Sequence, residues 1–192
     1  ALELDKNQPL GRLSLAECYN NLNKPKKALE LLERIKDLDF FSTIPLNVTN
    51  FQYSVELQRA LAYEKLGDLE QAIYACKRAH KICPNFQQAK DLSKHILHQL
   101  STDTTSLATL KRIAEPESAS SEDAYYYGNA LVQAGEVMAA ESAFRLALSR
   151  DKTNIRARRA LALILSKTSR VDEAKNVLME GLNIHKDVPD LT

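Results

Sequence analysis

Small and apolar residues recur along the chain at a spacing that is a multiple of 34 residues. Corresponding positions in residues 60–85 and 128–153 are separated by 68, which is twice 34. The pairs are Ala60 and Gly128, Tyr63 and Leu131, Gly67 and Gly135, Ala72 and Ala140, Ala79 and Ala147, and Ile82 and Arg150. No segment alternates strictly between apolar and polar residues beside hairpin turns. The pattern therefore predicts an all-α chain built from repeats.

The 34-residue spacing divides nearly the whole chain. Units that begin at Tyr53, Gln87, Ser121 and Ile155 follow one another without a gap, and an earlier unit begins at Pro9. The predicted division is 1–8 as the end of a preceding repeat, 9–42 as a repeat, 43–52 as an insertion, 53–86 as a repeat, 87–120 as a degenerate repeat, 121–154 and 155–188 as two more repeats, and 189–192 as a tail.

The spacing and the small residues resemble the tetratricopeptide repeat family. This resemblance implies a right-handed solenoid of antiparallel helix pairs, with about five units in this chain. Small residues let the two helices of a pair approach closely, and Ala60 with Ala72 supplies them in the unit from Tyr53. Gly67 and Gly135 fall at the turn inside a pair, where glycine tolerates a positive φ.

The unit 87–120 departs from the pattern. Lys94 stands at the small crossing position and Ser101 at the turn, and nine of the 22 residues from Ser101 to Glu122 are Ser or Thr. Such a composition is typical of a linker between two arrays. A free linker has no reason to keep the 34-residue length, however. We therefore expect a degenerate, shortened helix pair that bends or loosens the array.

Both ends of the chain suggest a fragment of a larger protein. Ala1 and Leu4 occupy the register positions of Ala79 and Ile82, so the sequence begins in mid-helix. After the unit 155–188, too few residues remain for the polar capping helix that a solenoid end usually has. Uncapped ends expose apolar helix faces, so self-association is one expectation.

Composition narrows the class of partner. The net charge is +1, which gives no field that favours nucleic acid or an anionic membrane. Eight basic residues and one acidic residue lie between Arg145 and Arg170, but they fall on different predicted helices, so we do not expect a nucleic-acid partner. No apolar run is long enough to span a membrane. Three cysteines, an odd number, favour a reducing compartment, and we expect a cytoplasmic location unless a leader on a longer parent chain directs it elsewhere.

No set of residues predicts catalysis, a cofactor or a metal site. Cys76, His80 and Cys83 lie on one helical face at spacings of four and three, which suits zinc. Cys76 corresponds to Phe144 and Leu178 of other units, however, so a core position is the preferred interpretation. We interpret His95 and His98 as solvated or hydrogen-bonded histidines, because nothing near them in the sequence completes a ligand set. The chain is therefore not expected to be an enzyme.

The resemblance implies that ligands lie along the concave groove lined by the first helix of each unit. The candidate partner-binding residues are Leu13, Leu57, Leu61, Tyr125, Asn129, Arg156 and Arg159. The leucines form an apolar half, which either contacts a partner or is covered by the insertion and the residues just before it, with Phe40, Phe41, Ile44 and Leu46. The arginines suit an acidic side chain or a phosphate.

These residues differ from one group within the family. Chaperone adaptors of this family grip a peptide carboxylate with basic residues and asparagine. Leu13, Leu57 and Leu61 replace those residues here, so an adaptor of that kind is not expected. The predicted function is a non-catalytic scaffold that binds a protein or peptide. The alternative is the targeting or substrate-recruiting arm of a larger enzyme or assembly machine.

Overall fold

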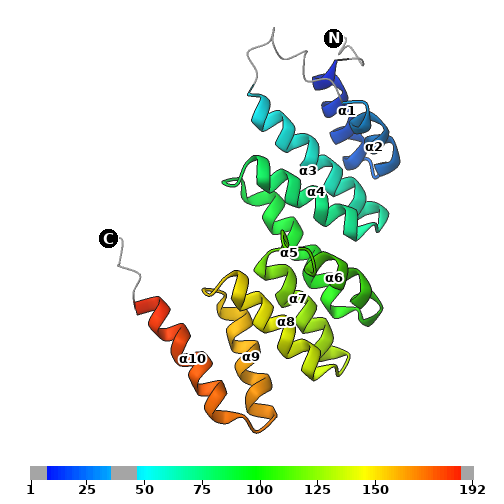
Figure 1. Ribbon diagram of the computed structural model, residues 1–192. Coiled ribbons are helices and arrows are strands. Elements are labelled where there is room, and N and C mark those ends of the chain that lie inside the picture. The colour runs from blue at the N-terminus through cyan, green and yellow to red at the C-terminus, as the bar shows by residue number, and fades with distance from the viewer. Residues whose placement is uncertain (1–7, 36–46, 187–192) are drawn as a thin grey trace. The chain divides into compact units, whose positions relative to one another are not determined.

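The computed structural model describes residues 8–35 and 47–186, and all regular structure within these ranges is helical (Figure 1). This confirms the all-α prediction. Predictions that fall on residues 1–7, 36–46 and 187–192, including the covering role of Phe40 and Phe41, lie outside the described residues. The elements are α1 (Pro9–Asn21), α2 (Pro25–Glu33), α3 (Val48–Leu66), α4 (Leu69–Ile82), α5 (Gln87–Thr102), η2 (Thr104–Ser106), α6 (Leu107–Ala114), α7 (Ser121–Gln133), α8 (Val137–Arg150), α9 (Ile155–Lys167) and α10 (Val171–Lys186).

The chain divides into two compact units, residues 1–96 and 97–192. In the first unit, α1 packs on α2 and α3 packs on α4, while α2 and α1 also contact α3. One core cluster, with Ala16 and Leu32, joins the first pair to α3. A second, with Ala60 and Cys76, extends to Ala89 at the start of α5. Helix pairs are thus stacked so that each shares a core with the next.

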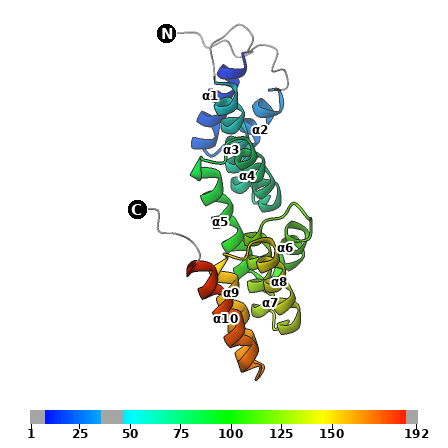
Figure 2. The ribbon, with the colours of Figure 1, turned by 60° about the vertical axis from the view of Figure 1, so that its left-hand side comes forward.

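In the second unit, α7 packs on α8 and α9 packs on α10, and α9 also contacts α8. Figure 1 and Figure 2 both show α9 between α8 and α10. The main core cluster of this unit joins Phe144 of α8 to Leu161 and Leu165 of α9. The helix α6 contacts α7. This arrangement leaves one face of the α9–α10 pair without a described helix on it.

The turn inside a helix pair has a left-handed residue at a repeated position. Gly67 has φ of 79° and Gly135 has φ of 80°, as the sequence predicts for these two glycines. Asn23 and Ser169 take the same position in their pairs, with φ of 54° and 62°. Ser101, the corresponding residue of the unit 87–120, instead lies inside α5. The turn of that unit is therefore displaced.

The unit 87–120 has a short second helix. The helix α6 contains eight residues, whereas α4 and α8 each contain 14. The 3₁₀ turn η2 precedes α6, and the Asp103 side chain accepts a hydrogen bond from the Thr105 amide there. Serine, threonine and aspartate favour such local side-chain bonds over a continued helix. The Ser- and Thr-rich composition thus accounts for the shortened helix.

The helix α3 begins earlier than the repeat spacing suggests. It starts at Val48, so residues 48–52, which the sequence assigned to an insertion, form its first turns. The Asn47 side chain accepts a hydrogen bond from the Asn50 amide and caps the helix. Phe51 is buried in the core with Leu32. A helix cap and an apolar anchor therefore extend α3 into the predicted insertion, and the other boundaries of the division stay predictions.

Candidate functional site

An open apolar groove lies on the α9–α10 pair, within residues 97–192. We call it the α9–α10 groove, and its volume is about 1030 Å³. The lining residues come from α7, α9 and α10, and they are Tyr125, Arg156, Arg159, Ala160, Ala162, Leu163, Ser166, Val171, Ala174, Lys175, Leu178, Met179 and Leu182.

The floor of the α9–α10 groove consists of large apolar side chains that are exposed to solvent. Leu163, Val171, Leu178, Met179 and Leu182 are each between 44% and 62% exposed. Scattered single apolar residues are normal on a protein surface, but these five line one groove. Contiguous exposed apolar residues with a polar rim mark interaction sites. The groove is therefore a candidate contact site.

The basic residues at the rim of the groove differ in whether other side chains of the protein already hold them, and Arg156 is held. The Arg156 guanidinium stacks on Tyr125 at 4.4 Å from the ring centroid, pairs with Glu122 at 3.2 Å, and donates a hydrogen bond to the Tyr126 hydroxyl. Burial opposes the charge on Arg156, but the contacts with the two tyrosines outweigh it and raise the pKa. Arg156 is thus held by α7.

Arg159 and Lys175 are the basic residues of the rim that are not held in this way. Both side chains are exposed, and neither forms an ion pair or a hydrogen bond within the described part of the chain. An arginine presents a planar fork of donors that matches a carboxylate, and a lysine presents a compact charge. These two cations are available to a ligand in the groove, whereas Arg156 is already engaged.

A buried arginine sets the distance between α9 and α10. Arg158 of α9 is buried, and its guanidinium donates hydrogen bonds to the carbonyl oxygens of Val177 (2.8 Å) and Lys152 (2.6 Å). It passes over Gly181 of α10, where a Cβ atom would overlap the Arg158 side chain. Because Gly181 has no side chain, α10 lies close to α9 with the charged Arg158 side chain between them. The two helices therefore form a rigid side of the groove.

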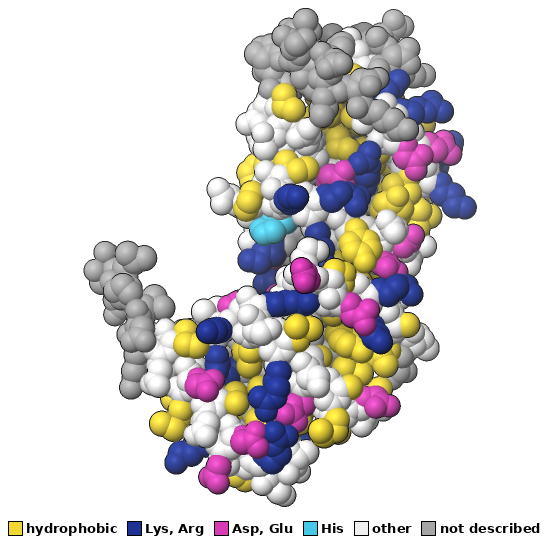
Figure 3. All heavy atoms as spheres, viewed as in Figure 1, with side chains coloured by type: hydrophobic (Ala, Val, Ile, Leu, Met, Phe, Trp, Pro, Cys, Tyr) yellow, Lys and Arg dark blue, Asp and Glu magenta, His cyan; other side chains and the backbone are white. Residues whose placement is uncertain are grey.

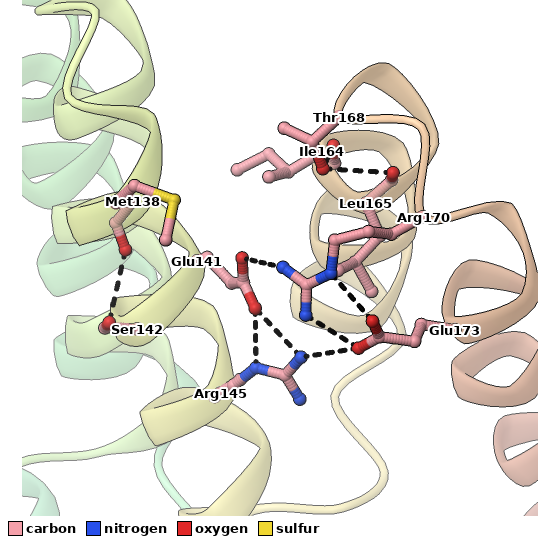
Figure 4. A network of polar contacts seen from close by, with 9 residues as sticks. All are labelled: Met138, Glu141, Ser142, Arg145, Ile164, Leu165, Thr168, Arg170 and Glu173. Carbon is pink, nitrogen blue, oxygen red and sulfur yellow. Dashed lines mark hydrogen bonds and ion pairs between the residues drawn. The ribbon is translucent and has the colours of Figure 1, made fainter.

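An ion-pair network fixes the turn that leads into α10. Glu141 of α8 is buried and accepts hydrogen bonds from Arg145 (2.9 Å) and Arg170 (2.7 Å). Arg170 also donates two hydrogen bonds to Glu173 at the start of α10, as Figure 4 shows. Burial opposes ionisation of Glu141, but the hydrogen bonds from Arg170 and Arg145 lower its pKa. The network ties α8 to the turn before α10.

The groove contains three of the seven predicted site residues. Tyr125, Arg156 and Arg159 line it together, as their register suggests. Asn129 is half-buried on α7 and is not among the lining residues.

The other three predicted residues lie in the first unit, and their surroundings differ from the expectation. Leu13, Leu57 and Leu61 are half-buried rather than exposed. Leu13 packs on the core that contains Leu32, and Leu57 packs on the core that contains Cys76. Leu13 and Leu57 are therefore partly used by the fold, which the position on a first helix alone does not reveal.

Sequence reasoning missed the residues that α10 supplies. Lys175, Leu178, Met179 and Leu182 come from the second helix of the last unit, and only first helices were expected to line a groove. A signal was present, because Leu178 occupies the register position of Phe144. A core position in the last unit, with no described helix beyond it, is an exposed position.

Arginines of the basic segment 145–170 are largely used by the fold. The contacts of Arg145, Arg156, Arg158 and Arg170 are described above. Arg150 donates hydrogen bonds to the carbonyl oxygens of Ala114 and Pro116. Figure 3 shows basic and acidic side chains interspersed on the face in view of each unit. Most arginines of the segment therefore make separate contacts within the fold.

The cysteine and histidine candidates have ordinary surroundings. Burial, with a smaller effect from Glu64, raises the pKa of the Cys76 thiol to about 12, so the thiol stays protonated and is a poor metal ligand or nucleophile. His98 makes an edge contact with Tyr126. Within residues 8–35 and 47–186, no group of three or more His, Cys, Asp or Glu residues is arranged to hold a metal ion. None of the described helices is both long and apolar enough to cross a membrane.

Comparisons with known proteins agree with this geometry. Models of the tetratricopeptide repeat match residues 54–86 and 12–39. MamA from Desulfovibrio magneticus RS-1 is similar in structure, with 17% identity, a TM-score of 0.51 and coverage of 97% of this chain and 98% of that one. MamA AMB-1 has 18% identity, a TM-score of 0.50 and coverage of 95% and 94%. At such identities the likeness concerns the fold alone. No curated protein matches the sequence.

Proposed function

We propose that this chain, in which residues 12–39 and 54–86 match models of the tetratricopeptide repeat, is a non-catalytic scaffold that binds a partner protein through the α9–α10 groove. Helix pairs of this family serve as frames for protein contacts, so an interaction role is the coarse expectation. The α9–α10 groove is the surface that we propose for that role. Its open form and apolar floor suit a segment of a protein better than a small molecule, which is usually enclosed.

The observation that carries the proposal is the exposed apolar floor. Leu163 and Leu182, which are 57% and 62% exposed, lie beside the unpaired cations Arg159 and Lys175. An apolar centre with a polar rim is the usual anatomy of a protein interface. Tyr125 and Arg156 add an aromatic and a guanidinium group, which are enriched where binding energy concentrates. The groove therefore combines affinity with a means of orienting a partner.

A comparative capture experiment tests the proposal. Immobilised wild-type protein and the double variant Leu163→Glu with Leu182→Glu are exposed to the same cell extract. We expect proteins that the wild type retains to be lost from the variant, because carboxylates in the floor cannot be desolvated. The matched control is Met138→Glu with Leu146→Glu, two exposed apolar residues of α8 outside the groove. Equal retention by wild type and groove variant, with helical circular dichroism unchanged, would refute the proposal.

The predicted residues of the first unit remain part of the proposal. Leu13, Leu57 and Leu61 expose part of their side chains and present apolar area to a second segment of a partner. A separate Leu57→Glu variant tests this half. Loss of a partner from Leu57→Glu but not from the α9–α10 groove variant would move the site to residues 1–96. Asn129 stays a proposed contact. That the chain is the recruiting arm of a larger enzyme or assembly machine stays a prediction, and so does its cytoplasmic location.

A further inference from the structure

The face of a helix pair that α9 and α10 leave open is covered by a following helix in other pairs of the chain. In the first unit, Ala89 and Leu92 of α5 pack over the core that contains Cys76 of α4. In the second unit, Leu161 and Leu165 of α9 pack over Phe144 of α8. In both cases the covering element is the first helix of the next pair. This face is therefore built to receive a helix.

The same register position shows the difference. Cys76, Phe144 and Leu178 are separated by 68 and 34 residues and occupy one position of the repeat. Cys76 is 1% exposed and Phe144 is 0% exposed, whereas Leu178 is 44% exposed. The residue type remains that of a core, but the covering helix is not among the described elements. The floor of the α9–α10 groove thus has the shape and chemistry of a surface on which a helix packs.

Ion pairs hold the α9–α10 pair against the preceding pair, and in two of them the acid comes from the preceding pair and the base from the α9–α10 pair. The underlying helices supply the acids, Glu122 and Glu141, and the covering pair supplies Arg156 and Arg170. At the next register, 34 residues later, the acids are replaced by Arg156 and Lys175. The charge at these positions is therefore positive in the α9–α10 groove, whereas it is negative in the preceding pair. A helix that docks on the groove needs acidic residues at the positions where α9 and the turn after it carry arginine.

We propose that the α9–α10 groove is the docking site for an amphipathic acidic helix of a partner protein, which lies across α9 and α10 as α9 lies across α7 and α8. The inference rests on the proposed function and specifies its partner. Apolar side chains at spacings of three and four fill the floor. Carboxylates of the helix pair with Arg159 and Lys175, because Arg156 is already paired with Glu122. A second copy of α9 would bring Arg156 and Arg170 against these cations and is disfavoured.

Two synthetic peptides test the polarity. Both copy residues 155–170, which contain α9 and the following turn, and have blocked termini. One keeps the natural sequence and the other carries Arg156→Glu and Arg170→Glu. Short helices are marginal in water, so both peptides lose affinity in the same way and only their ratio matters. In fluorescence anisotropy titrations at low salt, we expect the peptide with the two glutamates to bind the wild-type protein about tenfold more tightly, because two repulsive pairs become attractive.

A charge reversal in the protein completes the test. In the variant Arg159→Glu with Lys175→Glu, we expect the preference to reverse in favour of the natural, basic peptide. The control variant Lys152→Glu with Lys167→Glu changes the net charge equally at exposed positions outside the groove lining, and it should keep the wild-type preference. Absence of binding, or a preference that both variants alter equally, overturns the inference.

The outcomes separate this inference from the proposed function. If partner capture depends on Leu163 and Leu182 but the peptide preference does not reverse, the groove binds a protein of other chemistry and the acidic-helix inference fails alone. If light scattering shows dimers of the wild type that the Leu163→Glu with Leu182→Glu variant abolishes, the occupant is a second copy, and the inference is likewise overturned. If capture does not depend on the groove, both fail.

Discussion

Where α7 and α8 cross, a large side chain on one helix meets a residue without a side chain on the other. The first helix of a pair supplies Ala60, Gly128 or Ala162, and the second supplies Cys76, Phe144 or Leu178 at the corresponding position. The largest partner, Phe144, meets the smallest, Gly128. A Cβ atom on Gly128 would lie 2.5 Å from the Phe144 ring, and that ring is fully buried. Each pair thus holds its own combination of sizes.

We predict that Gly128→Ala destabilises the second unit. The ring cannot move away without opening the core, and overpacking of this kind costs about 1–3 kcal/mol. Alanine is the better helix former by about 1 kcal/mol, so the net loss in the free energy of unfolding is smaller than the strain. Urea unfolding measures it. Addition of Phe144→Leu, the residue that Leu178 represents one repeat later, should restore part of the loss. Strict additivity of the two substitutions would contradict the contact.

At the scale of elements, helix lengths and turns follow local sequence closely. The left-handed turn residues Gly67 and Gly135 were predicted because glycine is suited to a positive φ. Asn23 and Ser169 adopt the same conformation without being glycine, and the repeat spacing was the only clue to them. The early start of α3 was not predicted, because an Asn cap and one buried Phe51 are weak signals until the core around them is known.

We predict that Glu141→Gln loosens α10 in a pH-dependent way. The folded-state pKa of Glu141 is lowered, so its contribution is present above the unfolded value of about 4.3 and is lost as the pH falls through the folded value. At pH 7 the substitution should cost about 1–2 kcal/mol, because charged hydrogen bonds to Arg145 and Arg170 are weakened. The cost should be smaller at pH 3 than at pH 7, because the wild-type carboxyl becomes more protonated as the pH falls and then accepts weaker hydrogen bonds.

Urea unfolding at both values of pH is the measurement. Glu117→Gln serves as the matched control, because Glu117 is exposed in the loop before α7 and forms no ion pair within the described ranges. This control should change stability little at either pH. If the effect of Glu141→Gln were the same at pH 3 and pH 7, the network would stabilise the turn by packing and not by charge.

At the scale of the molecule, each of the core clusters described above lies within one of the two units. In repeat proteins, stability is roughly a sum of terms between neighbours, so damage stays local. We predict that Phe144→Ala, a loss of about 3–5 kcal/mol, reduces amide protection in α7, α8 and α9 while α1 to α4 keep theirs. Hydrogen exchange with mass spectrometry measures this. Equal loss in both units would show that they unfold together.

Much of the fold was predictable from the sequence, and the site was predictable only in part. The 34-residue period is an average over many positions, so it survives irregularities such as Ser101. The groove depends on which face of a pair lacks a covering helix, and that is a property of neighbours rather than of any residue. Tyr125, Arg156 and Arg159 were found because first helices were examined. Leu178 was read as core because its type is that of a core residue.

The pairing of Glu122 with Arg156, and of Glu141 with Arg170, gives the junction between two repeats a direction. If residues 121–154 were duplicated in tandem, Glu122 would face its own copy across the new junction, and like charges would meet where opposite charges now do. The repeats of the second unit are therefore interchangeable in outline but not in sequence order. Their charges favour the present order of neighbouring repeats and destabilise a chain in which that order is changed.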